Sequence, residues 1–357
     1  MAIRRVPEQD EDERETVQMN TMQTGLHSEA FQKFKSFSTR NIIVYVLIAL
    51  SIGFALGNNA FLQAANMVNL TTQMAINAML SAGLTYVIIL GGIDISVGAV
   101  GALSGVITAL VARQLPPETP VATIVAVQLG MGLVVGLIFG SFIGVIVAKF
   151  KVVPMIATLA SLNIARGLSY IFSGGTSVSG LKNNYSWLGA GRLFKTEGKP
   201  TGWLPIITIV VVLFVILMHV LLSKTVFGRH VYATGSNINV AHLSGINTAK
   251  VIFFGHVICA VMAALGGVLN SSKLQNGQPG AMEGYEMYAI AATVLGGTSL
   301  SGGSGSVGRA MIGVAVIAVI NNGMNLLHIN SYWQKAVIGA IILMAVILDM
   351  AQKKKKT

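Results

Sequence analysis

The sequence predicts an all-α integral membrane protein with about ten transmembrane helices. Only 10% of its 357 residues are charged and 53% are hydrophobic, whereas soluble domains carry about 25% charged residues. Apolar stretches long enough to cross a bilayer recur along the chain. Glycine is abundant, at 40 residues, and glycine permits close backbone contact between membrane helices.

Each predicted span is a mainly apolar stretch, because a helix needs about 20 such residues to cross the hydrocarbon core. Glycine-rich stretches set several of the boundaries. The expected spans are 41–57, 68–90, 96–112, 121–148, 153–174, 203–223, 251–270, 284–300, 308–327 and 333–350.

The two ends of the chain differ from the membrane domain at 41–350. Residues 1–40 contain seven of the 13 acidic residues, between Glu8 and Glu29, and lack a long apolar run. We expect a largely disordered cytoplasmic extension there. Residues 351–357 form a basic tail that we also expect in the cytoplasm.

Positive charge orients the predicted spans. The net charge of +11 comes from residues scattered between apolar spans, which argues against nucleic acid as a partner and for a membrane flanked by basic loops. An even number of spans puts both termini on one side, and the run Lys353–Lys356 argues that this side is the cytoplasm. The loop 175–202 carries four basic residues yet falls outside, where it is a candidate docking surface.

A polar interruption, residues 224–250, separates two apolar spans and is expected in the cytoplasm. It predicts one or two short helices, with Ser236 or Asn237 as a cap and Gly245 as the stop. Its small residues would let a partner approach closely. The alternative is a plain surface loop, although an ordered loop of this length is usually functional.

Two short stretches resemble each other: LGGIDISVG (90–98) and LGGTSLSGG (295–303). Each ends one apolar span and precedes another. Glycine-interrupted segments in corresponding halves often mark the pathway of a transporter, so Gly296 and Gly297 are candidate gate residues. The alternative interpretation, two tight turns at the membrane surface, stays open.

Ionisable residues within the apolar stretches are the other candidates for a gate, since charge at membrane depth is costly. Asp94 and Ser96 either line the pathway or cap the next helix. Arg166 either binds a polar solute or ties helices together through carbonyls or a carboxylate such as Asp94. Glu286 opens a span near the outer surface, where a carboxylate suits a helix start.

The sequence offers little support for an enzyme. Residues 303–308 fit GxGxxG but lie between membrane spans without the βαβ unit that a dinucleotide site requires. No P-loop motif and no arrangement typical of nucleophilic catalysis occurs. The single cysteine, Cys259, and the isolated histidines do not suggest a metal site.

Five motifs, taken in order, resemble the permease subunits of bacterial ABC importers for monosaccharides, the ribose-permease type, a group related to branched-chain amino-acid permeases. The resemblance covers roughly residues 40–352. The motifs are GGIDISVGAVGAL (91–103), VVPMIATLASLNIARGLSYIFSGG (152–175), GRHVYATGSNINVAHLSGIN (228–247), AIAATVLGGTSLSGGSGSVG (289–308) and NNGMNLLHINSYWQKAVIGAIILMAVILD (321–349).

This resemblance implies a type II ABC-importer-like permease fold at 41–350 in a bacterial cytoplasmic (inner) membrane. It implies a homodimer that works with ABC ATPase subunits and a periplasmic substrate-binding protein. ATP and Mg would be used by the ATPase, and this chain would bind no cofactor. Segment 224–250 would be the coupling segment that docks into the ATPase. The candidate coupling residues are Gly228, Arg229, Ala233, Gly235, Asn237, Ala241 and Gly245.

The implied function is ATP-driven import of a ribose-like pentose or a hexose by alternating access. The chain departs from the family at Met287-Tyr288, where Leu-Asp usually follows the residue equivalent to Glu286. This departure leaves a non-sugar solute open: an amino acid, a nucleoside or a furanose signal. A rival of another class is an ATP-independent secondary transporter or channel, which would want more buried acidic or histidine residues.

Overall fold

The computed structural model describes residues 42–181, 184–194 and 203–354. The chain divides into two units, Met1–Val46 and Leu47–Thr357, and only the start of one helix is described in the first. The predicted N-terminal extension, residues 1–40, and the end of the basic tail, residues 355–357, lie outside the described residues. All contacts discussed below are within the second unit.

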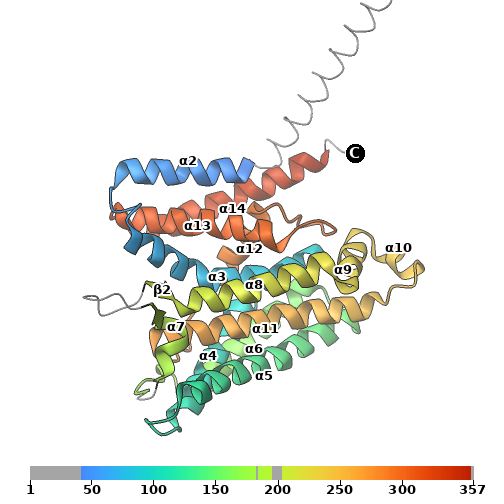
Figure 1. Ribbon diagram of the computed structural model, residues 1–357. Coiled ribbons are helices and arrows are strands. Elements are labelled where there is room, and N and C mark those ends of the chain that lie inside the picture. The colour runs from blue at the N-terminus through green and yellow to red at the C-terminus, as the bar shows by residue number, and fades with distance from the viewer. Residues whose placement is uncertain (1–41, 182–183, 195–202, 355–357) are drawn as a thin grey trace, which may run out of the picture. The chain divides into compact units, whose positions relative to one another are not determined.

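Each of the ten predicted apolar stretches falls on a helix (Figure 1). Most boundaries agree with the prediction to within four residues, because long apolar runs fix where a membrane helix can lie. These helices are α2 (Ile42–Gly57), α3 (Ala64–Ile89), α4 (Val97–Arg113), α5 (Val121–Ala148), α6 (Pro154–Ser173), α8 (Ile206–Lys224), α11 (Thr248–Leu274), α12 (Tyr285–Leu295), α13 (Val307–Leu326) and α14 (Ser331–Lys354).

Six of the described helices, α3, α5, α6, α8, α11 and α13, are long and apolar enough to cross a membrane. The chain therefore has the composition and helix lengths of a multi-pass membrane protein. The predicted span 284–300 is wrong in extent, because α12 has only 11 residues. It ends where Gly296 and Gly297 follow, and Gly297 adopts a φ of +89° that ends a helix readily.

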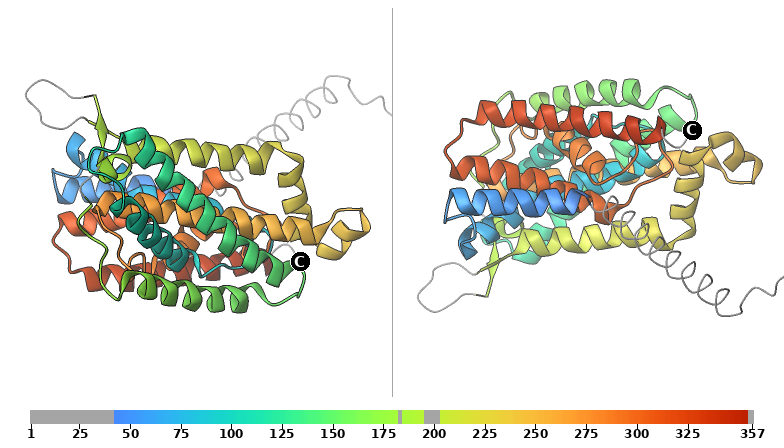
Figure 2. Two further views of the ribbon diagram at one scale, coloured as in Figure 1. Left: turned by 90° about the horizontal axis from the view of Figure 1, so that it is seen from below. Right: turned by 90° about the horizontal axis from the view of Figure 1, so that it is seen from above.

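The remaining described elements lie at the two ends of the long helices. At one end are η1 (Asn184–Ser186), α7 (Trp187–Ala190) and the strands β1 (Arg192–Leu193) and β2 (Leu204–Pro205). At the other end are α9 (Val226–Ser236) and α10 (Ile238–Leu243), as both views of Figure 2 show. The antiparallel pair β1–β2 is an exception to the predicted all-α class. Lys182, Lys195 and Lys199 of the predicted docking loop lie outside the described residues.

Helix α11 is the centre of the packing, with α5, α4 and α3 against it. Glycines make this close packing possible. Gly132, Gly136, Gly140 and Gly144 lie four residues apart on one face of α5, and at Gly140 an added Cβ would lie 2.6 Å from the Cα of Val257 in α11. Such a ridge of small residues is typical of helix contacts in membranes, where van der Waals packing drives association.

Three irregular segments interrupt the helical layers, at 90–96, 275–284 and 296–306. Part of the first two segments is buried: Gly92, Asp94 and Ser96 in the first, and Gly277 and Pro279 in the second. Irregular backbone is tolerated at membrane depth only where protein or a watery cavity surrounds it. These interruptions hold the candidate site residues.

Candidate functional site

The polar interruption at 224–250 forms two short helices, as predicted. Asn237 caps α10, because its Oδ1 accepts hydrogen bonds from the backbone N–H groups of Asn239 (3.0 Å) and Val240 (3.1 Å). Gly245, with a φ of +82°, ends it. The backbone N–H of Gly245 donates to His242 O and that of Ile246 donates to Ala241 O, which is a Schellman stop. Local rules therefore predicted this helix correctly.

Helix α10 exposes apolar side chains. Leu243 is 86% exposed, and Ile238 and Val240 are also exposed. Three exposed apolar side chains on one short, projecting helix suit contact with a partner protein. The sequence analysis missed these residues, although apolar residues inside an otherwise polar stretch were the signal. We call Ile238, Val240 and Leu243 the α10 surface.

Helix α9 packs on the chain's own two LGG stretches. Gly235 lies directly against the carbonyl oxygen of Ile89, and a Cβ there would overlap that oxygen and lie 2.9 Å from the backbone N of Gly303. The second stretch also bonds to the end of α3, directly before the first stretch, since the N–H of Gly303 donates to Ile89 O over 2.8 Å. Residues far apart in sequence, at 89, 235 and 303, thus meet at one point, which we call the three-way contact.

A second bond fastens α9 beside the three-way contact. The hydroxyl of Tyr232 donates to the carbonyl of Gly305 over 2.8 Å. Burial raises the pKa of Tyr232 above its ordinary value, so the hydroxyl keeps its proton as a donor. Helix α9 is therefore held to the segment that leads into α13.

The predicted coupling residues divide into two groups. Arg229, Asn237 and Gly245 are exposed at the surface of α9 and α10. Gly228 and Ala241 are buried, and Ala233 and Gly235 are half-buried. The interpretation of Gly235 as room for a partner was wrong, because the space at Gly235 is filled by Ile89 and Gly303 of the same chain.

Asp94 is fully buried and does not cap α4, which was one of the two predicted alternatives. Its Oδ1 instead accepts bonds from the backbone N–H (2.8 Å) and the hydroxyl (2.6 Å) of Ser96, and neither side chain caps the first amides of the helix. Its Oδ2 accepts no bond from an N–H or O–H group of the described residues. His256 and the Cys259 thiol of α11 lie close enough to interact with it electrostatically.

Arg166 ties helices together through carbonyls, one of the predicted alternatives. One guanidinium nitrogen, Nη1, donates to Pro279 O (2.7 Å) and Ala281 O (2.8 Å) in the segment between α11 and α12. The carboxylate that interacts with it electrostatically is Glu286; no bond from Arg166 to Asp94 is found among the described residues. Arg166 therefore fixes the turn segment between α11 and α12 to α6.

Glu286 opens α12, as predicted, and faces the start of α4. Its Oε1 accepts a bond from the N–H of Gly284 (3.2 Å). Its other oxygen lies beside Gly98, where an added Cβ would be 2.6 Å from Oε2. A carboxylate next to the first turn of α4 is favourable, because the amino end of a helix carries partial positive charge.

Gly296 and Gly297 form a tight turn after α12. Gly296 has no room for a side chain, since a Cβ would lie 2.7 Å from the Cα of Ala310 in α13. The N–H of Gly297 donates to Val294 O over 2.8 Å. These glycines allow α12 and α13 to pack closely, and neither lines a pocket described here.

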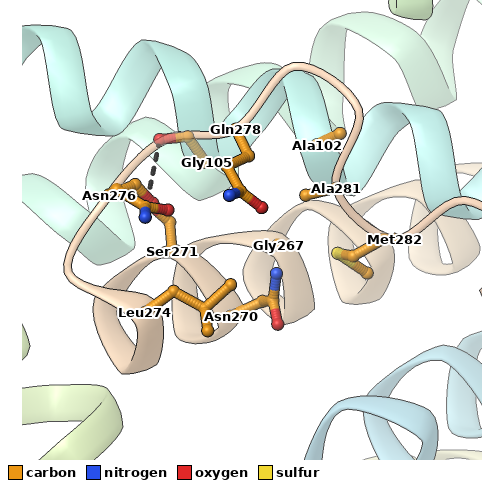
Figure 3. Close-up of a pocket in the computed structure, with 10 residues that line it drawn as sticks. All are labelled: Ala102, Gly105, Gly267, Asn270, Ser271, Leu274, Asn276, Gln278, Ala281 and Met282. Carbon is orange, nitrogen blue, oxygen red and sulfur yellow. Dashed lines mark hydrogen bonds between the residues drawn. The ribbon is translucent and has the colours of Figure 1, made fainter. Parts of the chain in front are cut away.

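A pocket of about 360 Å³ lies beside the segment between α11 and α12. Its polar lining residues are Asn270, Lys273, Gln278 and Glu283. The pocket adjoins a closed crevice between α4 and α11 that has no room for a water molecule. Figure 3 shows Asn270 and Gln278 reaching toward this crevice, with Ser271 bonded to the carbonyl of Asn276. The sequence analysis did not predict these residues.

Comparison with known proteins gives consistent matches. The model of the family described as "Branched-chain amino acid transport system / permease component" matches residues 66–346. The chain is 40% identical to the ribose import permease protein RbsC of Bacillus subtilis (strain 168) over 336 residues, which is 94% of this chain and 98% of that protein.

Two further relatives carry other names. The L-arabinose transport system permease protein AraH of Escherichia coli (strain K12) is 32% identical over 88% of this chain and 91% of its own length. The galactose/methyl galactoside import permease protein MglC of Haemophilus influenzae is 31% identical over 92% of this chain and 99% of its own length. No solved structure matches.

Proposed function

The chain belongs to the family described as branched-chain amino acid transport system / permease component, and on this premise we propose that it is the membrane permease subunit of an ATP-driven importer for a monosaccharide, a ribose-like pentose or a hexose. It is a transport subunit and not an enzyme. The observation that carries the proposal is 40% identity over 98% of a ribose import permease. The arabinose and galactose relatives support a sugar as the solute class.

Energy enters through partners in this proposal. An ABC ATPase binds ATP and Mg and docks on the α10 surface, where Leu243 is 86% exposed. A periplasmic binding protein delivers the solute from the other side, and a second copy of the chain completes the pore. The exposed apolar side chains of α10 support the docking, since clustered apolar residues on a surface are typical of interaction sites.

Coupling passes through the three-way contact. The ends of α3 and α12 and the starts of α4 and α13 flank the two LGG stretches that α9 touches. A push on α10 moves α9, and the packing of Gly235 against Ile89 and Gly303 leaves little space in which that motion could be absorbed. The displacement therefore reaches four helices at once and opens the pathway to the other side.

The same arrangement supports an orientation of the chain in the membrane. We propose that the α9–α10 end faces the cytoplasm and that all ten long stretches cross the inner membrane in a type II fold. Five basic residues lie in or next to connections at that end, in agreement with the excess of basic residues on cytoplasmic loops. They are Lys149, Lys151, Lys224, Arg229 and Lys250. Helix α14 also ends there (Figure 1), which supports a cytoplasmic carboxyl terminus.

A second candidate solute is an amino acid. The family description itself names branched-chain amino acids, and the Met287-Tyr288 pair differs from the Leu-Asp usual in the sugar permeases. Met287 is 54% exposed, so its side chain is available to a solute or a partner. The sugar is favoured because the named relatives transport sugars.

The test is solute-specific uptake. Sealed vesicles contain the chain in the membrane, with its partner ATPase and ATP inside and its binding protein outside. Labelled ribose, arabinose, galactose or leucine is then added to the outside. We expect accumulation of at least one sugar and none of leucine. Accumulation of leucine alone would show that the solute is an amino acid and not a sugar.

A further inference from the structure

We propose that the 360 Å³ pocket beside the segment 275–285 is a transient binding site for a neutral polyhydroxylated solute. The pocket lies near the carboxyl end of α11, away from α9 and α10. This inference rests on the proposed function and names the place where the solute first meets the permease. Its volume is within the range of about 300–1,000 Å³ typical of small-molecule sites.

The lining offers both kinds of hydrogen-bonding group. Asn270 and Gln278 each bring a carbonyl acceptor and an NH₂ donor, Lys273 brings donors and Glu283 brings acceptors. A sugar hydroxyl both donates and accepts, so it can pair with any of these groups. Tyr285 and Leu274 supply apolar surface for the carbon side of a sugar ring.

The charges of the lining disfavour a solute that carries a net charge. Lys273 and Glu283 contribute one charge of each sign to the pocket, so the lining is neutral in sum and does not concentrate anions or cations. The pocket is also open to solvent along the exposed residues Gln278 and Glu283. A wet, neutral and polar site binds weakly, which suits a transporter that has to release its solute.

One wall of the pocket is held rigidly from behind. Arg166 donates hydrogen bonds to Pro279 O and Ala281 O, and the Ser169 hydroxyl donates to Pro279 O over 3.3 Å. These carbonyls bond to side chains of α6. The residues next to them in the chain, Gln278, Gly280 and Met282, line the pocket. Hydrogen bonds to α6 therefore hold this wall of the pocket in place.

The inner side of the pocket is closed. Asn270, Gln278 and Met282 are shared with the crevice between α4 and α11 (Figure 3). That crevice has no room for water, because the backbones of Gly101 and Gly267 touch. A solute in the pocket thus meets a closed floor, and a separation of α4 from α11 would extend the pocket inward.

Protection of introduced thiols from modification tests the site. The only cysteine of the chain, Cys259, is buried, so a Cys259→Ala background gives a thiol-free chain. Gln278→Cys and Glu283→Cys place reporters in the wall of the pocket. Gln114→Cys is the matched control, since Gln114 is exposed at the end of α4 and does not line the pocket.

Each variant, in the full complex, is labelled with a membrane-impermeant maleimide in the presence of ribose, arabinose or galactose. Occupancy slows labelling by the factor 1 + [L]/Kd, about tenfold at ten times the dissociation constant. We expect this slowing at Gln278→Cys and Glu283→Cys, none at Gln114→Cys, and none with gluconate or leucine as the added solute.

Three outcomes would overturn the site. Unchanged labelling of both reporters, in complexes that still import the sugar, would remove the pocket from the pathway and leave the proposed function intact. Equal protection by gluconate or leucine would refute a neutral polyol as the solute class. Failure of the unmodified complex to import any sugar would refute the proposed function itself, and the pocket assignment with it.

Discussion

Substituting Gly235 by alanine addresses the coupling mechanism at its narrowest point. The added methyl group overlaps the carbonyl oxygen of Ile89 and lies 2.8 Å from the carbonyl carbon of Ile89 and 2.9 Å from Gly303 N. Favourable contacts of a carbon atom lie at about 3.5–4.0 Å. Either α9 or the backbone at Ile89 and Gly303 must therefore shift by about 1–2 Å.

The energetic size of this shift follows from the packing. Inserting an extra methyl group into a tightly packed site costs about 1–3 kcal/mol. If that energy opposes the coupled conformation, transport falls about 5- to 150-fold, at 1.4 kcal/mol per factor of ten. The α10 surface is not altered, so the ATPase should still bind.

The assay measures both sides of the coupling. Sugar uptake and ATP hydrolysis are followed in the same proteoliposomes, and their ratio is compared between the original chain and Gly235→Ala. The control is Gly130→Ala in α5, a helical glycine with no atom within 4 Å of the added Cβ. We expect a normal ratio for the control and a ratio reduced by the factor above for Gly235→Ala.

Normal uptake per ATP in a folded Gly235→Ala complex would refute the reasoning. A loss of both assembly and hydrolysis would also count against it, because the mutation would then act on folding or docking and not on the link between α9 and the LGG stretches. Retained hydrolysis with lost uptake is the predicted signature.

Further variants at three other contacts extend the test. Leu243→Asp should leave folding unchanged, because the side chain is 86% exposed, and should weaken ATPase binding by about 2 kcal/mol or more, measured by titration of ATPase onto the permease. Arg166→Met should lower the stability by about 3 kcal/mol, because two charge-assisted bonds to carbonyls are lost. Arg166→Lys should retain most of the stability, since a single nitrogen makes both bonds. Thermal unfolding in detergent distinguishes the two variants. Asn66→Leu and Asn322→Leu should each cost about 1–3 kcal/mol by orphaning the other amide of a reciprocal pair. The double variant should cost less than the sum, and an additive result in the same unfolding assay would show that the pair is not coupled.

The sequence was sufficient to place most of the long apolar helices. Long apolar runs can satisfy their backbone groups in lipid only as helices, so each run predicts its own location. The error at 284–300 has a local cause: Gly296 and Gly297 were counted in an apolar run, although two successive glycines end α12 at Leu295. Hydropathy does not record that a glycine adopts a positive φ.

Within the candidate site, local features were predictable and tertiary ones were not. Asn237 and Gly245 act on backbone groups within a few residues, so the limits of α10 followed from capping rules. The neighbours of Gly235 are 146 residues before it and 68 after it, at Ile89 and Gly303, and no local pattern connects them. For the same reason the sequence named Arg166 as a tie between helices but not Pro279 and Ala281 as its partners.

The pocket residues show a third limit. Asn270, Lys273 and Gln278 are ordinary polar residues near the end of an apolar run and fit no motif. They become a site only because the segment after α11 turns back along α4 and is held by Arg166. A pocket of this kind is a property of the packed helices.

The dependence of uptake on ATP tests the central proposal most directly. Labelled ribose, arabinose and galactose are offered to proteoliposomes that hold the permease alone, and to others that hold it with its ATPase and binding protein, with and without ATP. We expect accumulation of a sugar against its gradient only in the complete complex with ATP. Sugar flux through the permease alone, at the rate of the complete complex, would contradict it and identify the chain as an ATP-independent transporter.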